Sequence, residues 1–223
     1  MNKLTDYFIR FRHELLKSFL ETFEMLIFAM IMAFIFGLLL GLIMFLTRPK
    51  GLFQNKTVYF VISTLVNIVR SIPFILFIIV LIPTTRFIIG TGFGVDASKL
   101  PLSLIGIATF ARLSEQSLLE VNKDIYETSY ALGANTYQYI KDFLLKESRQ
   151  SLVLSFTSTT ISLISYSTVM GVIGGGGLGY LAISEGYQNF NYPLMWIIII
   201  IMIIIVQLVQ TIGNSLAKKL DKR

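Results

Sequence analysis

Cysteine is absent from the 223 residues, and histidine occurs once, at His13. The chain therefore lacks disulfides, thiolate metal ligands, a cysteine nucleophile and a histidine cluster that could hold a metal. The apolar stretches contain no spaced carboxylate pair and no serine–histidine arrangement, so we expect neither a catalytic residue nor a metal site. Charged residues are also scarce, at 14%, where an ordinary soluble domain has about 25%.

Apolar residues dominate instead, at 54% of the chain, and the mean hydropathy is +0.72. A helix that crosses a hydrocarbon core of ~30 Å needs ~20 apolar residues. Five apolar runs meet this need, which predicts an all-α integral membrane protein with about five transmembrane helices. The predicted spans are 22–46, 57–83, 100–119, 151–173 and 193–216.

The segments around these runs have characters of their own. Residues 1–21 combine helical apolar spacing with charges, which predicts an amphipathic helix in the membrane interface. Gly37 and Gly41 are four residues apart and favour close helix packing. Pro73 should bend the second span, and residues 84–99 should form a loop. The glycine run from Gly171 to Gly179 lacks the GKS or GKT of a phosphate-binding loop, so we expect tight turns or flexibility there.

The basic residues predict an orientation. With five spans, the 47–56 loop, the 120–149 segment and the basic tail at 217–223 lie on one side. The positive-inside rule places that side in the cytoplasm and the N-terminus outside. The basic N-terminal segment argues the other way, but three regions agree against it. The concentration of Lys and Arg on the cytoplasmic side thus accounts for the net charge of +6. No nucleic-acid partner is expected.

Three charged residues lie inside the predicted spans. Arg112 and Glu115 are three apart and should pair on one helix face. Arg70 is costly in the middle of the second span, so it should face the bundle interior. A structural pair with Glu115 or Glu120 is favoured over attraction of a substrate carboxylate.

The 120–149 segment is the longest charged stretch between spans. It predicts two short helices separated by Gly133, which can adopt a left-handed backbone where the first helix ends. Such a knuckle, residues 126–145, suits docking against a soluble partner, although a plain solvated loop remains open from physics alone.

The residues of the knuckle carry a resemblance. The spacing Glu127-x5-Gly133-x9-Phe143-x-Leu145 resembles the EAA motif of binding-protein-dependent ABC importer permeases. Thr128 and Ser129 replace the alanines of that motif, Phe143 its isoleucine and Lys146 its proline. The stretches 68–94, 111–121 and 166–181 further resemble the methionine-importer (MetI-like) permeases, and the resemblance extends from about residue 15 to the end.

This resemblance implies a type I ABC importer permease of five helices, located in the cytoplasmic membrane of a bacterium. It would act as a homodimer with two cytoplasmic ATPase subunits, which bind the ATP and magnesium, and an external methionine-binding lipoprotein. This chain would hold no cofactor itself and would pass D- or L-methionine inward by alternating access. The residues expected to couple to the ATPase are Glu127, Thr128, Ser129, Ala131, Gly133, Ala134, Phe143 and Leu145.

The fourth span is rich in hydroxyl groups. Such groups often just bond to backbone carbonyls, but their density here favours a water-accessible face that lines the passage at a dimer axis. Val169 and Met170 could then form an apolar constriction near its outer end. The predicted passage face comprises Ser155, Ser158, Thr159, Ser162, Ser165 and Tyr166.

Two alternatives stay open at this point. The substrate could be another small amino acid, a peptide or a quaternary amine. The chain could also be an independent channel or an intramembrane enzyme.

Overall fold

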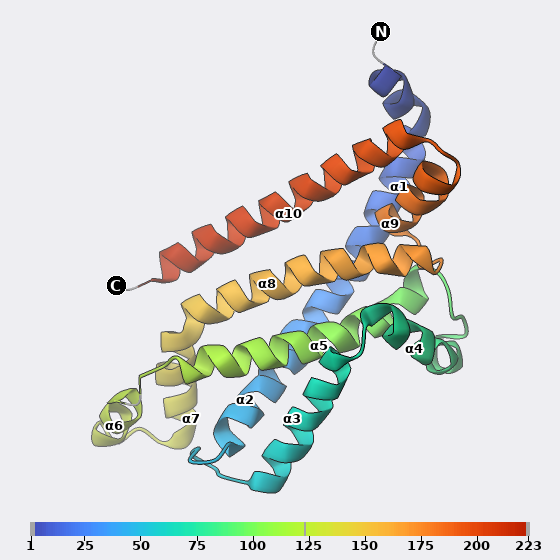
Figure 1. Cartoon of the computed structure of the whole chain (residues 1–223). Coiled ribbons are helices and arrows are strands. Elements are labelled where there is room, and N and C mark those ends of the chain that lie inside the picture. The colour runs from blue at the N-terminus through green and yellow to red at the C-terminus, as the bar shows by residue number, and fades with distance from the viewer. Residues whose placement is uncertain (1–2, 123, 222–223) are drawn as a thin grey trace.

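The computed structural model describes residues 3–122 and 124–221, and the regular elements in these ranges are all helices (Figure 1). The first is a continuous rod in which α1 (Lys3–Met32) passes through a π-helical turn, η1 (Ala33–Gly37), into α2 (Leu38–Thr47). Its stretch Phe11–Thr47 is apolar and long enough to cross a membrane. The segment predicted as a separate interfacial helix is thus joined to the first span without a break. Its charges interrupt the apolar pattern but leave the helix intact.

Gly37 and Gly41 bring this rod close to α5 (Val95–Leu119), as their spacing predicted. A Cβ atom on Gly41 would lie 2.7 Å from the carbonyl oxygen of Ala111 and 2.7 Å from the Cβ of Ser114. Because any side chain would clash there, glycine sets the distance between the two helices.

The second predicted span is broken rather than gently bent. Helices α3 (Lys56–Ser71) and α4 (Phe74–Ile89) meet at Ile72 and Pro73 with an angle of 109°. Asn55 caps α3 through hydrogen bonds from the N–H groups of Thr57 and Val58. The predicted loop at 84–99 is wrong for most of its length, because α4 continues to residue 89 and α5 starts at residue 95. Pro83 is accommodated inside α4.

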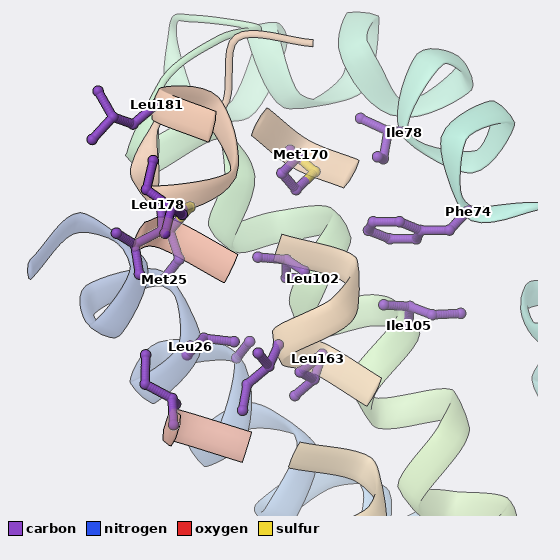
Figure 2. Close-up of a cluster of buried hydrophobic side chains, with 14 of the residues drawn as sticks. Met25, Leu26, Phe74, Ile78, Leu102, Ile105, Leu163, Met170, Leu178 and Leu181 are labelled. Carbon is purple, nitrogen blue, oxygen red and sulfur yellow. The ribbon is translucent and has the colours of Figure 1, made fainter. Parts of the chain in front are cut away.

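Helix α5 is the central element of the bundle and contacts α1, α2, α3, α4 and α8 (Figure 1). Most of its side chains are buried, including small residues at several of these contacts. Although it contains the third predicted span, it is not among the three helices that are long and apolar enough to cross a membrane, or the four if the bent pair α3–α4 is one span. The main core lies between α5, α1, α8 and α9, where Leu102, Met25, Leu163 and Leu178 meet (Figure 2).

The charged segment contains one short helix and the start of a very long one. Helix α6 (Asp124–Ala131) is followed by α7 (Thr136–Gln138), which continues through the π-helical η2 (Tyr139–Leu144) into α8 (Leu145–Val172). The expectation of two separate short helices is therefore wrong for the second, since residues 136–172 form one helix. Residue 123 of this segment and residues 222–223 of the predicted basic tail lie outside the described residues.

The glycine-rich run makes a tight turn before α9 (Gly177–Leu181), η3 (Ala182–Gln188) and α10 (Tyr192–Leu220). Gly174, Gly176 and Gly177 have positive φ values, as tight turns require. The turn is tied to α1, because Glu21 accepts a hydrogen bond from the Gly177 N–H at 2.9 Å. Thr22 likewise accepts one from the Leu178 N–H at 2.8 Å. These bonds fix the turn to the N-terminal rod.

Candidate functional site

The knuckle is a tightly hydrogen-bonded unit. At the end of α6 the Ala134 N–H donates to the Ser129 carbonyl and the Gly133 N–H to that of Tyr130, which is a Schellman motif. Gly133 has φ +73°, the left-handed backbone predicted from the sequence. Asn135 and Gln138 then form a reciprocal capping box at the start of α7. Few backbone groups of the turn are left free, so the knuckle has one defined shape.

The base of the knuckle rests on the ends of two spanning helices. Tyr139 and Leu144 are buried in a cluster with Phe45 from α2 and Leu118 from α5. The ring of Tyr126 meets that of Tyr139 edge to face, with centroids 5.1 Å apart. A force applied to the knuckle would therefore reach α2, α5 and α8 together.

The predicted coupling residues divide into an exposed set and a buried or half-buried base. Glu127, Thr128, Ala131 and Gly133 are exposed, whereas Ser129 is 1% exposed and holds the helix in place. The remaining three are half-buried on the side of the bundle: Ala134, Phe143 and Leu145.

The sequence reasoning missed the most exposed apolar side chains of the knuckle. Tyr130, Leu132 and Tyr137 are 76%, 71% and 69% exposed. Large apolar groups that project into water from a rigid turn are typical of a protein contact surface. The sequence feature that could have revealed this surface is the occurrence of large apolar residues beside Gly133 in an otherwise polar segment.

A cleft with a volume of about 460 Å³ separates the knuckle from the 48–52 loop. Arg48 and Lys50 line it on one side and Glu127 on the other. The cleft therefore places charges of both signs beside the exposed residues of the knuckle.

The hydroxyl-rich face of α8 is real but narrower than predicted. Ser158 and Ser165 are exposed, and Ser155 and Ser162 are half-exposed on the same side of the helix. Val169 continues this side toward the outer end. Several of the hydroxyls also donate to carbonyls one turn back, for example Ser162 to Ser158 at 3.0 Å. Ser158 and Ser165 are thus open to the surroundings of the chain, whereas the Ser155 hydroxyl lies 2.9 Å from that of Ser117 on α5.

Three of the predicted passage residues lie elsewhere. Thr159 is 0% and Met170 is 3% exposed, and Met170 belongs to the main core (Figure 2). Tyr166 is half-buried, with its ring 4.5 Å from that of Phe74. Including Thr159 and Met170 in the passage face is therefore wrong for this structure, because neighbouring helices bury both side chains.

Of the three charged residues predicted inside the spans, two pair as predicted and Arg70 does not. Arg112 Nη1 lies 2.6 Å from Glu115 Oε2, so the predicted local ion pair forms. Glu120 instead accepts a hydrogen bond from the Ser151 hydroxyl at 2.6 Å. Both acceptors proposed for Arg70 are thus occupied, and Arg70 is exposed with no ion pair among the described residues. The prediction that Arg70 faces the interior of its own bundle is wrong.

Comparison with known proteins gives a consistent result. Residues 33–223 match the family described as "Binding-protein-dependent transport system inner membrane component". The chain is 40% identical over 206 residues to the probable D-methionine transport system permease protein MetI of Pasteurella multocida, covering 92% of this chain and 95% of the relative. It is 43% identical over 182 residues to the methionine import system permease protein MetP of Bacillus subtilis, covering 81% and 82%.

Solved structures agree with these relatives. A chain from inward-facing conformations of the MetNI methionine ABC transporter superposes with a TM-score of 0.91 at 33% identity. The superposition covers 100% of both chains. A chain of an amino acid ABC transporter crystallised with histidines has a TM-score of 0.80 at 14% identity, which shows that the fold is shared.

Proposed function

Since the chain belongs to the family of binding-protein-dependent transport system inner membrane components, we propose that it is the permease subunit of an ATP-driven methionine importer. The observation that carries this proposal is full-length similarity to methionine permeases, in both sequence and structure. The substrate is D- or L-methionine, moved inward by alternating access. The membrane is the cytoplasmic membrane of a bacterium.

ATP hydrolysis takes place in separate subunits under this proposal. The chain offers a rigid, exposed knuckle with apolar tips at Tyr130, Leu132 and Tyr137. A cleft in each of two cytoplasmic ATPase subunits, which bind the ATP and magnesium, would receive this knuckle. One knuckle per chain fits a two-fold assembly, so the permease is a homodimer. A methionine-binding lipoprotein delivers substrate from outside.

The fold links docking to the passage. Residues 136–172 form one helix, so the stem of the knuckle and the hydroxyl face of α8 belong to the same rod. When the ATPases close, the knuckles approach each other and the rods tilt. The face with Ser158, Ser162 and Ser165 then opens toward the outside, and hydrolysis restores the inward-facing state.

The orientation places the knuckle and the C-terminus in the cytoplasm and the N-terminus outside. Single cysteines in this cysteine-free chain test it directly with a membrane-impermeant maleimide on intact spheroplasts. A cysteine at Tyr130 should be protected, and one at Phe190, before α10, should be labelled. The reverse pattern would contradict the coupling role.

Uptake by proteoliposomes that contain the full complex tests the function. Radiolabelled methionine should accumulate only with ATP and the binding protein, whereas a dipeptide or a quaternary amine should not. Accumulation without the ATPase, or a stronger response to another solute, would favour the channel or another substrate.

A further inference from the structure

An apolar groove with a volume of about 530 Å³ lies on the side of α8 opposite its hydroxyl face. Met30 and Leu38 form one wall, Val209 and Leu216 of α10 form the other, and Phe156 lies on the floor. The hydroxyls of Thr157 and Thr160, which also line it, donate to carbonyls of their own helix at 2.8 and 2.9 Å. Apart from its cytoplasmic end, the groove is therefore suited to bind an apolar ligand.

At that end lies a cation with no partner in the part of the chain that the structure describes. Arg149 lines the groove and is half-buried, and no ion pair or hydrogen bond of its side chain occurs among the described residues. Two acidic groups of this part of the chain are engaged, since Asp142 pairs with Lys146 at 2.9 Å and Glu120 bonds to Ser151, and Glu147 is exposed and does not line the groove. A guanidinium has five N–H donors in a planar fork that matches phosphate oxygens. Arg149 is thus available to an anion at the mouth of the groove.

The length of the groove matches one leaflet of a bilayer. Arg149 and Thr160, which mark its two ends on α8, are 11 residues apart. At a rise of ~1.5 Å per residue they are separated by about 16 Å, which is half of a hydrocarbon core of ~30 Å. In the proposed orientation this charged end lies at the cytoplasmic interface, and Lys218 and Lys219 follow the groove residue Leu216 in the last turn of α10.

We propose that this groove binds one anionic phospholipid of the cytoplasmic leaflet. Its phosphate group bonds to Arg149, and one acyl chain lies between α2 and α10 against Phe156. A helix of a second copy would cover the apolar walls equally well, but it would supply no anion for Arg149. The charge of Arg149 and the length of the groove, which matches one leaflet, together therefore favour a lipid.

Native mass spectrometry of the intact complex, purified from membranes in mild detergent, tests the proposal with phosphatidylglycerol as the probe. Arg149→Gln should lower the retained lipid by at least about tenfold, as expected for losing a charge-assisted contact. Lys146→Gln, one turn away on the same helix, is the matched control and should retain the lipid. Val153→Trp, which fills the groove and keeps the charge, should also remove it. Equal retention by all three variants would overturn the proposal.

A cysteine at Val153 distinguishes a lipid from a second copy. Its thiol should be protected from N-ethylmaleimide in the complex as purified and become reactive after the lipid is stripped with detergent. A thiol that stays protected after stripping, while the dimer persists, would show that protein covers the groove and would refute the lipid assignment.

Discussion

Removing the arginine of the Arg112–Glu115 pair should destabilise the protein far more than removing both partners. The side chain of Glu115 is 2% exposed and lies on the central helix, where Arg112 is its cationic partner at 2.6 Å. Arg112→Leu would leave a buried carboxylate with no compensating charge. Loss of one partner of a buried pair costs ~3–5 kcal/mol. Because the Arg112 side chain is itself 30% exposed and water can reach the site, we expect about 3 kcal/mol.

The double variant Arg112→Leu/Glu115→Leu removes the charge together with its partner. Replacing a buried ion pair by apolar residues of similar volume is often neutral or stabilising, by ~1–4 kcal/mol. The double variant should therefore recover most of the loss, which gives a coupling energy of about 3 kcal/mol in a double-mutant cycle. The single variant should unfold roughly 10 °C below the parent.

Thermal unfolding of the four proteins in the same detergent, followed by circular dichroism and by loss of the monodisperse peak in size-exclusion chromatography, measures this cycle. Glu115→Leu alone should lose less stability than Arg112→Leu, because a half-exposed guanidinium keeps access to water. If Arg112→Leu unfolds within about 1 °C of the parent, or if the double variant is no better than the single, the pair contributes little and the reasoning fails.

Three further outcomes follow from the knuckle, the helix contacts and the isolated arginine. The variants Glu127→Lys and Gly133→Pro should insert into the membrane normally but uncouple ATP hydrolysis from uptake. The control Gly133→Asn should retain uptake, because asparagine tolerates a left-handed backbone. Normal uptake by Glu127→Lys and Gly133→Pro would contradict the coupling role. Gly41→Ala should lower stability by ~1–3 kcal/mol, because its Cβ would lie 2.7 Å from the Ala111 carbonyl oxygen; an unchanged unfolding temperature would show that α2 and α5 separate easily. Arg70→Gln should change stability by less than about 0.5 kcal/mol, since Arg70 is exposed and both predicted acceptors are occupied; a large loss would reveal a structural partner.

Local patterns in the sequence predicted the parts of the structure that depend on neighbours along the chain. The left-handed turn at Gly133, the Arg112–Glu115 pair and the close approach at Gly41 each follow from one residue type or a spacing of three or four. The long apolar runs likewise predicted the approximate position of three helices that are long and apolar enough to cross a membrane, Phe11–Thr47, Thr136–Val172 and Tyr192–Leu220, although five spans were predicted. These features need no knowledge of what lies across the bundle.

Features that depend on distant contacts were not predictable in the same way. Pro73 signals a bend, but the break of 109° also depends on where the Phe74 ring packs against Tyr166. The hydroxyl pattern of α8 has the right period, yet only the surrounding helices decide that Thr159 is buried while Ser158 is exposed. Arg70 was predicted to pair with Glu115 or Glu120, but Glu115 pairs with Arg112, three residues before it on the same helix.

The buried base of the knuckle favours movement of the protomer as a rigid body over local bending. Tyr139 and Leu144 are packed between Phe45 at the end of α2 and Leu118 at the end of α5, so the π-helical segment η2 cannot shift alone without opening this cluster. Exposing these four side chains would cost ~1.5–3 kcal/mol each. Tilting the whole bundle costs far less, because it only exchanges one contact with lipid for another. The glycine-rich turn at the opposite end of α8 is also fixed, through the hydrogen bonds of Glu21 and Thr22 to the start of α9. With both ends of α8 anchored to other helices of the same chain, a push on the knuckle would rotate the bundle as a unit, so in the proposed homodimer the passage would open between the two copies rather than within one.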